Sequence, residues 1–210
     1  MNDFSNAPYA LIRGAKLRQP ILYIVRHGST GDDDSYNSPE NPPLTEEGKQ
    51  DAEAAAKFFS NKKIGNLLSS VYDRSKETAE VIGTAINKKV QPDKDIDSLD
   101  VGEVSELSSK EEADKVIQHH QANKDKPFPG GESIARFHER VFPAFMESIN
   151  NFYKTGEPDV MAAHHSVQHA AGEFFNGDMN SALTKTGGVI AVYQIGPAKF
   201  EAIPVFRPEK

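Results

Sequence analysis

The sequence of 210 residues contains no cysteine. This absence excludes a disulfide framework, a thiolate nucleophile, and any zinc or iron–sulfur site that is bound through sulfur. Covalent chemistry in this protein must therefore use another nucleophile.

Long apolar runs are also missing. The longest, Ile21 to Val25 and Val189 to Val192, are far shorter than the roughly 20 residues that a membrane-spanning helix needs. A basic start followed by an apolar block, the mark of a secretory signal, is absent from the N-terminal segment, MNDFSNAPYALIRGAK. We therefore expect a cytoplasmic protein with no membrane partner.

Basic residues are outnumbered by acidic ones, 24 to 31, which gives a formal net charge of −7. A chain of this charge does not favour a nucleic-acid surface, so no nucleic-acid partner is expected. Net charge says nothing against one small cationic pocket inside an acidic body.

Apolar strand patterns alternate with helical patterns along the chain. Strands are predicted at residues 21–25, 67–71 and 159–163, with two closing strands near 189–195 and 200–206. Helices are predicted after the first two strands, with Thr45 and Asp73 as their caps. This order predicts an α/β fold, a three-layer α/β/α sandwich with a mostly parallel central sheet.

We expect one domain over residues 1–210, with an N-terminal extension at 1–19 and an inserted helical cap at 89–158. The cap region is charged, rich in serine, interrupted by proline and glycine, and without an apolar strand. Ser109 and Ser133 are predicted to begin helices within it. The second of these helices carries a stripe at helical spacing that predicts core packing: Ile134, Phe137, Val141, Phe145 and Ile149.

Histidines follow two of the predicted strands. His27 comes after residues 21–25, and His164 comes after residues 159–163. Ligands collect at the carboxyl ends of strands in open α/β sheets, so the two imidazoles are expected to share one crevice. Arg26 precedes the first histidine, and Arg74 follows the strand at 67–71. Two arginines and two histidines around one point predict an anion site, most naturally for a phosphoryl group.

These strand-end motifs, in this order, resemble the histidine phosphatase superfamily, which has the phosphoglycerate-mutase-like fold. The resemblance extends from about residue 21 to 195 and rests on Arg26-His27-Gly28-Ser29-Thr30, Leu44-Thr45-Glu46-Glu47-Gly48, Ser69-Ser70 through Arg74 with Thr78-Ala79, Gly130-Gly131-Glu132-Ser133 with Arg140, and Ala163-His164. It implies that neutral His27 attacks phosphorus and becomes a phosphohistidine, and that Arg26, Arg74 and His164 hold the phosphoryl oxygens. It also implies that no metal or other cofactor takes part.

The general acid that protonates the leaving group is less clearly marked. Superfamily members usually place an acidic residue four positions before a glycine; if that glycine is Gly102, the position holds Ser98. We favour Asp100, because its Leu-Asp-Val-Gly turn resembles a family variant, and we rank Glu103 second. Both are equally well explained as solvated loop carboxylates.

The leading hypothesis is therefore a metal-independent phosphomonoesterase that acts on a small phosphorylated substrate or a phosphopeptide. The alternatives are a phosphomutase of the same fold and a catalytically impaired protein that binds phosphorylated ligands. The cap has no second arginine cluster for a second phosphate, which favours hydrolysis. His165 and His169 have a helical spacing that can bind zinc, but with no third ligand a surface or packing role is favoured.

Overall fold

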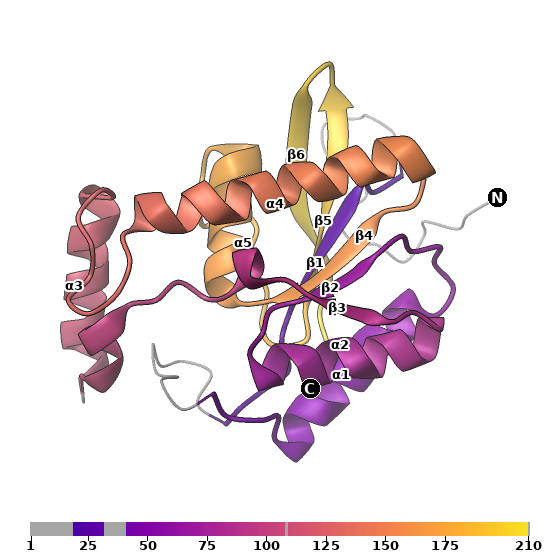
Figure 1. Ribbon diagram of the computed structural model, residues 1–210. Helices are drawn as coiled ribbons and strands as arrows, with labels where there is room; N and C mark the ends of the chain where they lie inside the picture. Colours follow the sequence, from indigo (N-terminus) through magenta and orange to yellow (C-terminus); the bar gives the residue numbers. More distant parts are fainter. Residues whose placement is uncertain (1–18, 32–40, 108, 210) are drawn as a thin grey trace.

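The computed structural model describes residues 19–31, 41–107 and 109–209. Its centre is a six-stranded sheet in the order β3-β2-β4-β1-β5-β6 (Figure 1). The strands are β1 (Leu22–Arg26), β2 (Leu67–Ser69), β3 (Val90–Pro92), β4 (Asp159–Ala163), β5 (Val189–Gly196) and β6 (Lys199–Phe206). β1 to β4 run parallel, whereas β5 and β6 are antiparallel to their neighbours. The predicted α/β fold with a mostly parallel sheet is confirmed. Residues 1–18 of the predicted N-terminal extension lie outside the described residues.

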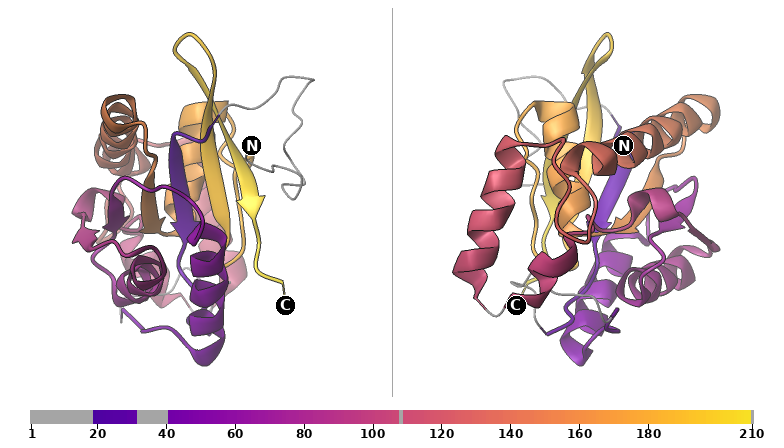
Figure 2. Two further views of the ribbon diagram at one scale, coloured as in Figure 1. Left: turned by 90° about the vertical axis from the view of Figure 1, so that its right-hand side faces the viewer. Right: turned by 60° about the vertical axis from the view of Figure 1, so that its left-hand side comes forward.

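Apart from Arg26 at the end of β1 and Asp159 at the start of β4, the two central strands are apolar because helices cover both faces of the sheet. In β1, Tyr23 and Val25 pack in one buried cluster with side chains of α1 (Glu46–Phe59) and α2 (Asp73–Ile86). Leu22 and Ile24, which point the other way, pack in a second cluster with α4 (Ile134–Thr155) and α5 (His165–Ala171). Figures 1 and 2 show these helix pairs on the two sides of the sheet. Three layers result, as predicted.

Three of the four predicted helix caps, Thr45, Ser109 and Ser133, are correct, and Asp73 is wrong. Thr45 Oγ1 accepts the N–H of Gly48 at 3.1 Å, which satisfies a free donor at the start of α1. The N-cap of α2 is Tyr72, and Asp73 is the first helical residue. An aspartate is favourable at either position, since its charge complements the positive end of the helix, so the sequence does not separate the two.

The predicted cap at residues 89–158 is too wide. β3 lies within it and pairs with β2 at the edge of the sheet, and α4 belongs to one of the helical layers. The strand was not predicted because its three residues, Val-Gln-Pro, carry no apolar pattern. The part outside the layers, residues 93–133, is what we call the cap from here on. It contains two 3-10 turns, Lys94–Ile96 and Gly102–Glu106, and the helix α3 (Lys110–Ala122).

The cap has a small apolar core of its own, distinct from the two clusters on the sheet, made of Val101, Val104, Ala113, Ile117, Phe128 and Ile134. α3 stands apart from the sheet beside the rest of the molecule (Figure 2). Hydrogen bonds join Asp100 to Glu132, near the C-terminal end of the cap. The N–H of Glu132 donates to Asp100 O at 3.0 Å, and the N–H of Asp100 donates to Glu132 Oε1 at 3.1 Å.

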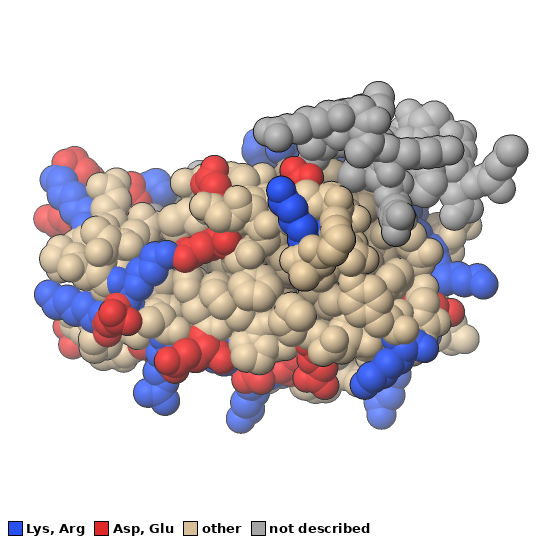
Figure 3. Space-filling model, turned by 90° about the horizontal axis from the view of Figure 1, so that it is seen from above, with Lys and Arg blue, Asp and Glu red and all other residues tan. Residues whose placement is uncertain are grey.

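Charged side chains of both signs are interspersed on the face above α4 (Figure 3). The described part of that face shows no continuous field of one sign. Among the described helices, none combines the length and the apolar character that a bilayer span requires.

Candidate active site

The carboxyl ends of β1 and β4 bring two histidines together. His27 directly follows β1, and His164 directly follows β4, which is the parallel neighbour of β1. The N–H of His27 donates to Ala163 O at 2.9 Å, and the centroids of the two imidazole rings are 5.3 Å apart. Both side chains are buried. The structure thus places the two predicted histidines side by side.

The ring of His27 is held by the next residue in the chain. Its Nδ1 lies 2.8 Å from Gly28 O. A carbonyl oxygen can only accept, so Nδ1 carries the proton in this contact and the lone pair of the neutral ring is on Nε2. A neutral imidazole oriented in this way offers Nε2 as a nucleophile.

Two glycines allow the loop after β1 to lie against the start of α1. A Cβ atom on Gly28 would lie 2.1 Å from Gly48 O, and one on Gly48 would lie 2.1 Å from Ser29 O. No side chain fits between these backbones. The N–H of Gly28 also donates to Thr78 Oγ1 at 3.1 Å, and the Thr78 hydroxyl donates to Arg74 O at 2.7 Å. The loop that carries His27 is therefore fixed to α1 and to the turn of α2 that carries an arginine.

His164 is held from its other side by serine hydroxyls. Its Nε2 lies 2.7 Å from Ser70 Oγ and 3.4 Å from Ser75 Oγ. Burial, together with the positive charges of His27, Arg74 and other cations nearby, places the pKa of His164 well below the usual 6.5. Its Nδ1 is buried and has no hydrogen-bond partner among the described residues.

The two predicted arginines flank the histidines. Arg74, in the first turn of α2, is 4% exposed, and its Nη1 is buried with no hydrogen-bond partner among the described residues. Its guanidinium lies 4.5 Å from the centre of the Tyr72 ring, and burial lowers its pKa. Arg26 donates from Nη1 to Thr184 O at 3.4 Å. Guanidinium groups at this point suit the oxygens of a phosphoryl group.

These groups open into a cleft of about 690 Å³ between the strand ends and the cap. All the predicted site residues line it: Arg26, His27, Arg74, Asp100, Glu103 and His164. Within the residues that the structure describes, no three His, Asp or Glu side chains are grouped so that they could hold a metal ion. Two cations, two histidines and two carboxylates in one cleft can transfer a phosphoryl group to a histidine.

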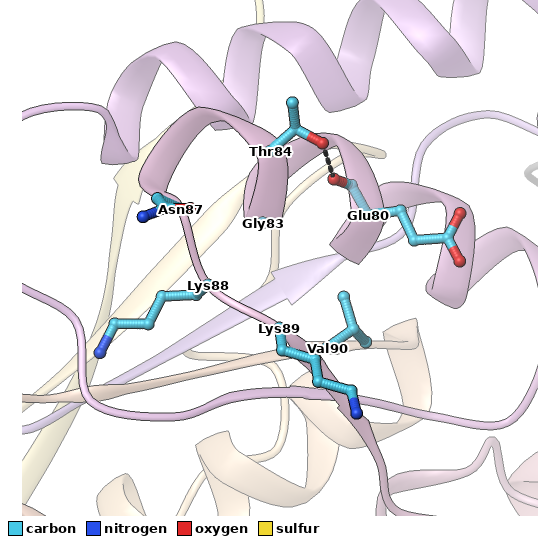
Figure 4. A pocket seen from close by; sticks show the side chains of 7 residues that line it. All are labelled: Glu80, Gly83, Thr84, Asn87, Lys88, Lys89 and Val90. Carbon is cyan, nitrogen blue, oxygen red and sulfur yellow. Dashed lines mark hydrogen bonds between the residues drawn. The ribbon is translucent and has the colours of Figure 1, made fainter.

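A second hollow lies elsewhere and lacks these groups. It has a volume of about 670 Å³ and is lined by residues at the end of α2 and the start of β3, namely Glu80, Gly83, Thr84, Asn87, Lys88, Lys89 and Val90. In Figure 4 the amino groups of Lys88 and Lys89 point apart from each other. With no histidine in its lining, this hollow has no candidate nucleophile comparable to His27.

Comparison with known proteins agrees with this geometry. The sequence profile of the histidine phosphatase superfamily (branch 1) matches residues 22–187. The chain belongs to the histidine phosphatase superfamily. A relative from Salmonella choleraesuis, named "Probable phosphoglycerate mutase GpmB", is 30% identical over 134 residues. The match covers 61% of this chain, and the chain spans only about 62% of the length of that relative.

Solved structures share the fold of this superfamily member. A mycobacterial glucosyl-3-phosphoglycerate phosphatase superposes with a TM-score of 0.75 at 17% identity, over 89% of this chain and 98% of the other. The protein TTHB049 from Thermus thermophilus gives 0.66 at 24% identity, over 88% and 98%. These identities are low, so the likeness concerns the arrangement of strands and helices.

The histidine phosphatase fold places both candidate acids on the cap side of the cleft. Asp100 is exposed, and its Oδ1 accepts the N–H of Gly102 at 2.9 Å. Glu103 lies in the 3-10 turn that follows and is also exposed. Ser98, which the resemblance puts at the acid position if the following glycine is Gly102, lies with its hydroxyl 3.2 Å from Ser166 Oγ. Asp100 and Glu103 both stay candidates on this geometry.

Sequence reasoning missed part of the lining. His165 and His169, which were assigned a surface or packing role, line the cleft from α5. Their spacing of four residues puts both on one side of a helix directly after β4, but it does not show that this side faces the cleft. Tyr72 was also missed, although its ring packs edge-on against His164 with the centroids 5.3 Å apart. Its position two residues before Arg74 could have indicated this contact.

Proposed function

We propose that this superfamily member is a metal-independent phosphomonoesterase that acts through a phosphohistidine on His27. The observation that carries the proposal is the 2.8 Å contact between His27 Nδ1 and Gly28 O, because it leaves Nε2 as the nucleophile in a residue that lines the cleft. The expected substrates are small phosphorylated molecules or phosphopeptides.

In the first step, the lone pair of His27 Nε2 attacks phosphorus while the bond from phosphorus to the leaving oxygen breaks. Arg26 and Arg74 hold the non-bridging oxygens and offset their negative charge in the transition state. His164 Nδ1 donates a third hydrogen bond to the same oxygens. Because these fixed groups stabilise the charge, the step needs no metal ion.

The leaving oxygen takes a proton from a carboxyl group, which we assign to Asp100, with Glu103 as the alternative. In the second step, a water molecule attacks the phosphohistidine and loses a proton to the same carboxylate. The bond between phosphorus and Nε2 breaks, inorganic phosphate leaves, and His27 and the acid regain their starting forms.

The nucleophile is tested by His27→Ala. Phosphate release from p-nitrophenyl phosphate, measured in excess chelator, is expected to fall by a factor of about 1,000 or more, because the covalent route is lost. His119→Ala removes an exposed imidazole on α3 and is the matched control. Activity that survives in the first variant, or that disappears on chelation in the unaltered protein, contradicts the proposal.

The acid is tested by Asp100→Asn and Glu103→Gln with two esters. A nitrophenolate leaves without protonation, whereas an alkoxide does not. The variant that lacks the acid is expected to lose a factor of about 100 or more with an alkyl phosphate and much less with p-nitrophenyl phosphate. If neither variant loses more activity with the alkyl phosphate than with p-nitrophenyl phosphate, neither carboxylate is the acid.

A phosphomutase is the second candidate, supported by the similarity to the Salmonella relative named as a probable phosphoglycerate mutase. The two functions share the phosphohistidine and differ in what accepts its phosphoryl group. The protein is allowed to react briefly with a radiolabelled phosphate ester. An acid-labile label on His27 that is then released as inorganic phosphate supports the phosphatase. Transfer of the label to a second hydroxyl of an added product supports the mutase, and absence of covalent label supports a protein that only binds phosphorylated ligands.

A further inference from the structure

The cleft extends from the phosphate site to the cap, and its two ends differ in chemistry. Arg26 and Arg74 line the phosphate end. The other charged side chains in the lining are one lysine and four carboxylates, namely Lys110, Asp100, Glu103, Glu106 and Glu173. Once the arginines engage a phosphoryl group, the leaving group therefore meets an excess of negative charge.

The carboxylate of Glu173 is already paired. It binds Lys124 Nζ through Oε1, and its Oε2 lies 4.0 Å from His138 Nε2. The three carboxylates of the segment from Asp100 to Glu106 remain, and all three are exposed. A second carboxylate or phosphate on the substrate would lie among these like charges, which costs binding energy even in a solvated cleft.

Uncharged hydrogen-bonding groups also line the cleft. Burial, as the largest cause, lowers the pKa of His138, His165 and His169, so all three imidazoles are neutral near pH 7. His169 Nδ1 lies 3.0 Å from Met179 O and donates to it, which leaves Nε2 as an acceptor. Ser98, Ser105 and Gln121 also line the cleft. Such neutral donors and acceptors suit hydroxyl groups.

We propose that the substrate is a phosphorylated sugar or polyol whose leaving group carries several hydroxyls and no second negative charge. This inference rests on the proposed phosphatase function and narrows its substrate class. Hydroxyl protons can be donated to the carboxylates of Asp100, Glu103 and Glu106, and hydroxyl oxygens can accept from Gln121. The apolar side chains of Leu99 and Phe137 in the lining can pack against the carbon face of a sugar.

Two esters of nearly equal size test the inference. Glycerol 3-phosphate and 3-phosphoglycerate differ in that a hydroxymethyl group replaces a carboxylate. We expect kcat/KM for glycerol 3-phosphate to exceed that for 3-phosphoglycerate by about tenfold or more, because of the like charges at the cap end. A preference for 3-phosphoglycerate, or for phosphoethanolamine with its cationic leaving group, overturns the inference.

Activity with p-nitrophenyl phosphate distinguishes a wrong substrate class from a wrong phosphatase assignment. If the protein hydrolyses the aryl ester but prefers 3-phosphoglycerate, the phosphatase proposal stands and only the substrate class is wrong. If it hydrolyses none of the esters, the proposed function fails and the inference fails with it.

A charge reversal in the cleft tests whether the carboxylates cause this substrate preference. Glu106→Lys is expected to shift the ratio of the two kcat/KM values toward 3-phosphoglycerate by about tenfold. Glu112→Lys makes the same change on the exposed surface of α3, outside the cleft lining, and is expected to leave the ratio unchanged. Equal ratios in both variants and in the unaltered protein overturn the electrostatic basis of the inference.

Discussion

Ser70 Oγ lies 2.7 Å from His164 Nε2, at the point where β2 and β4 end side by side. The N–H of Tyr72 donates to the same serine oxygen at 3.3 Å. With its oxygen accepting from the backbone, the Ser70 hydroxyl has one proton to donate, either to Nε2 or to the carboxylate of Asp97, and we assign it to Nε2. His164 then carries its proton on Nδ1, the nitrogen that we assign to a phosphoryl oxygen.

Ser70→Ala is therefore expected to lower kcat for p-nitrophenyl phosphate by about tenfold or more, because a buried hydrogen bond that orients His164 is lost. The ¹⁵N chemical shifts of His164 should report loss of a single Nδ1–H tautomer. Ser148→Ala removes another buried serine, on α4 and outside the cleft lining, and should change neither. An unchanged tautomer in Ser70→Ala contradicts the assigned role.

Gly28→Ala should destabilise the fold as well as abolish activity, because its Cβ would lie 2.1 Å from Gly48 O. Since backbone must move to relieve this overlap, we expect a loss of about 3 kcal/mol or more in the free energy of unfolding, measured by urea titration. At Gly196 the nearest atom to an added Cβ lies 3.6 Å away, so Gly196→Ala is the control and should cost little. Equal stabilities of the two variants would rule out the close approach.

Arg140 fixes the segment that enters the cap. Its guanidinium donates to Asp97 O at 3.0 Å, to Ser98 O at 2.9 Å and to Glu132 Oε1 at 2.6 Å. Arg140→Met removes the donor that these three acceptors share and should destabilise the protein by roughly 1–3 kcal/mol and raise KM. Arg136→Met, one turn earlier on the exposed side of α4, should change neither the stability nor KM. Thermal unfolding measures the first and initial rates measure the second.

Stability should fall in mild acid. The pKa of His164 is lowered well below 6.5 by burial and by neighbouring cations, so below pH 6.5 the unfolded chain binds a proton that the folded protein does not. The contribution of His164 to the free energy of unfolding is therefore greatest above pH 6.5 and decreases by up to about 1.4 kcal/mol per pH unit below it. Urea unfolding at several pH values gives the free energy of unfolding as a function of pH. Below pH 6.5 this free energy should change less steeply with pH in His164→Gln than in the control His119→Gln. Parallel slopes would contradict the assignment.

The phosphate end of the site was predictable because its residues lie in short segments with strong local signals. His27 and His164 each follow an apolar strand, and neighbouring parallel strands must bring such residues to one edge of the sheet. The hydrogen bond from Ser70 to His164 joins residues 94 positions apart, so no local pattern contains it.

The boundary of the cap was not predictable for a different reason. The short strand β3 is held in the sheet by its pairing with β2, with Val90 packed against the buried cluster, and three residues are too few to show an apolar pattern. The cleft lining from α5 was missed because the helical spacing of His165 and His169 does not reveal which neighbour the helix faces. In each case the deciding interaction is tertiary.

The hydrogen bonds between Asp100 and Glu132 close the cap into a loop with a narrow base, since the chain leaves and returns at one place. Insertions, deletions or exchanges beyond that base need not move the ends of β1 and β4. A different insertion could therefore be joined at this base while His27 and His164 keep their places at the ends of β1 and β4.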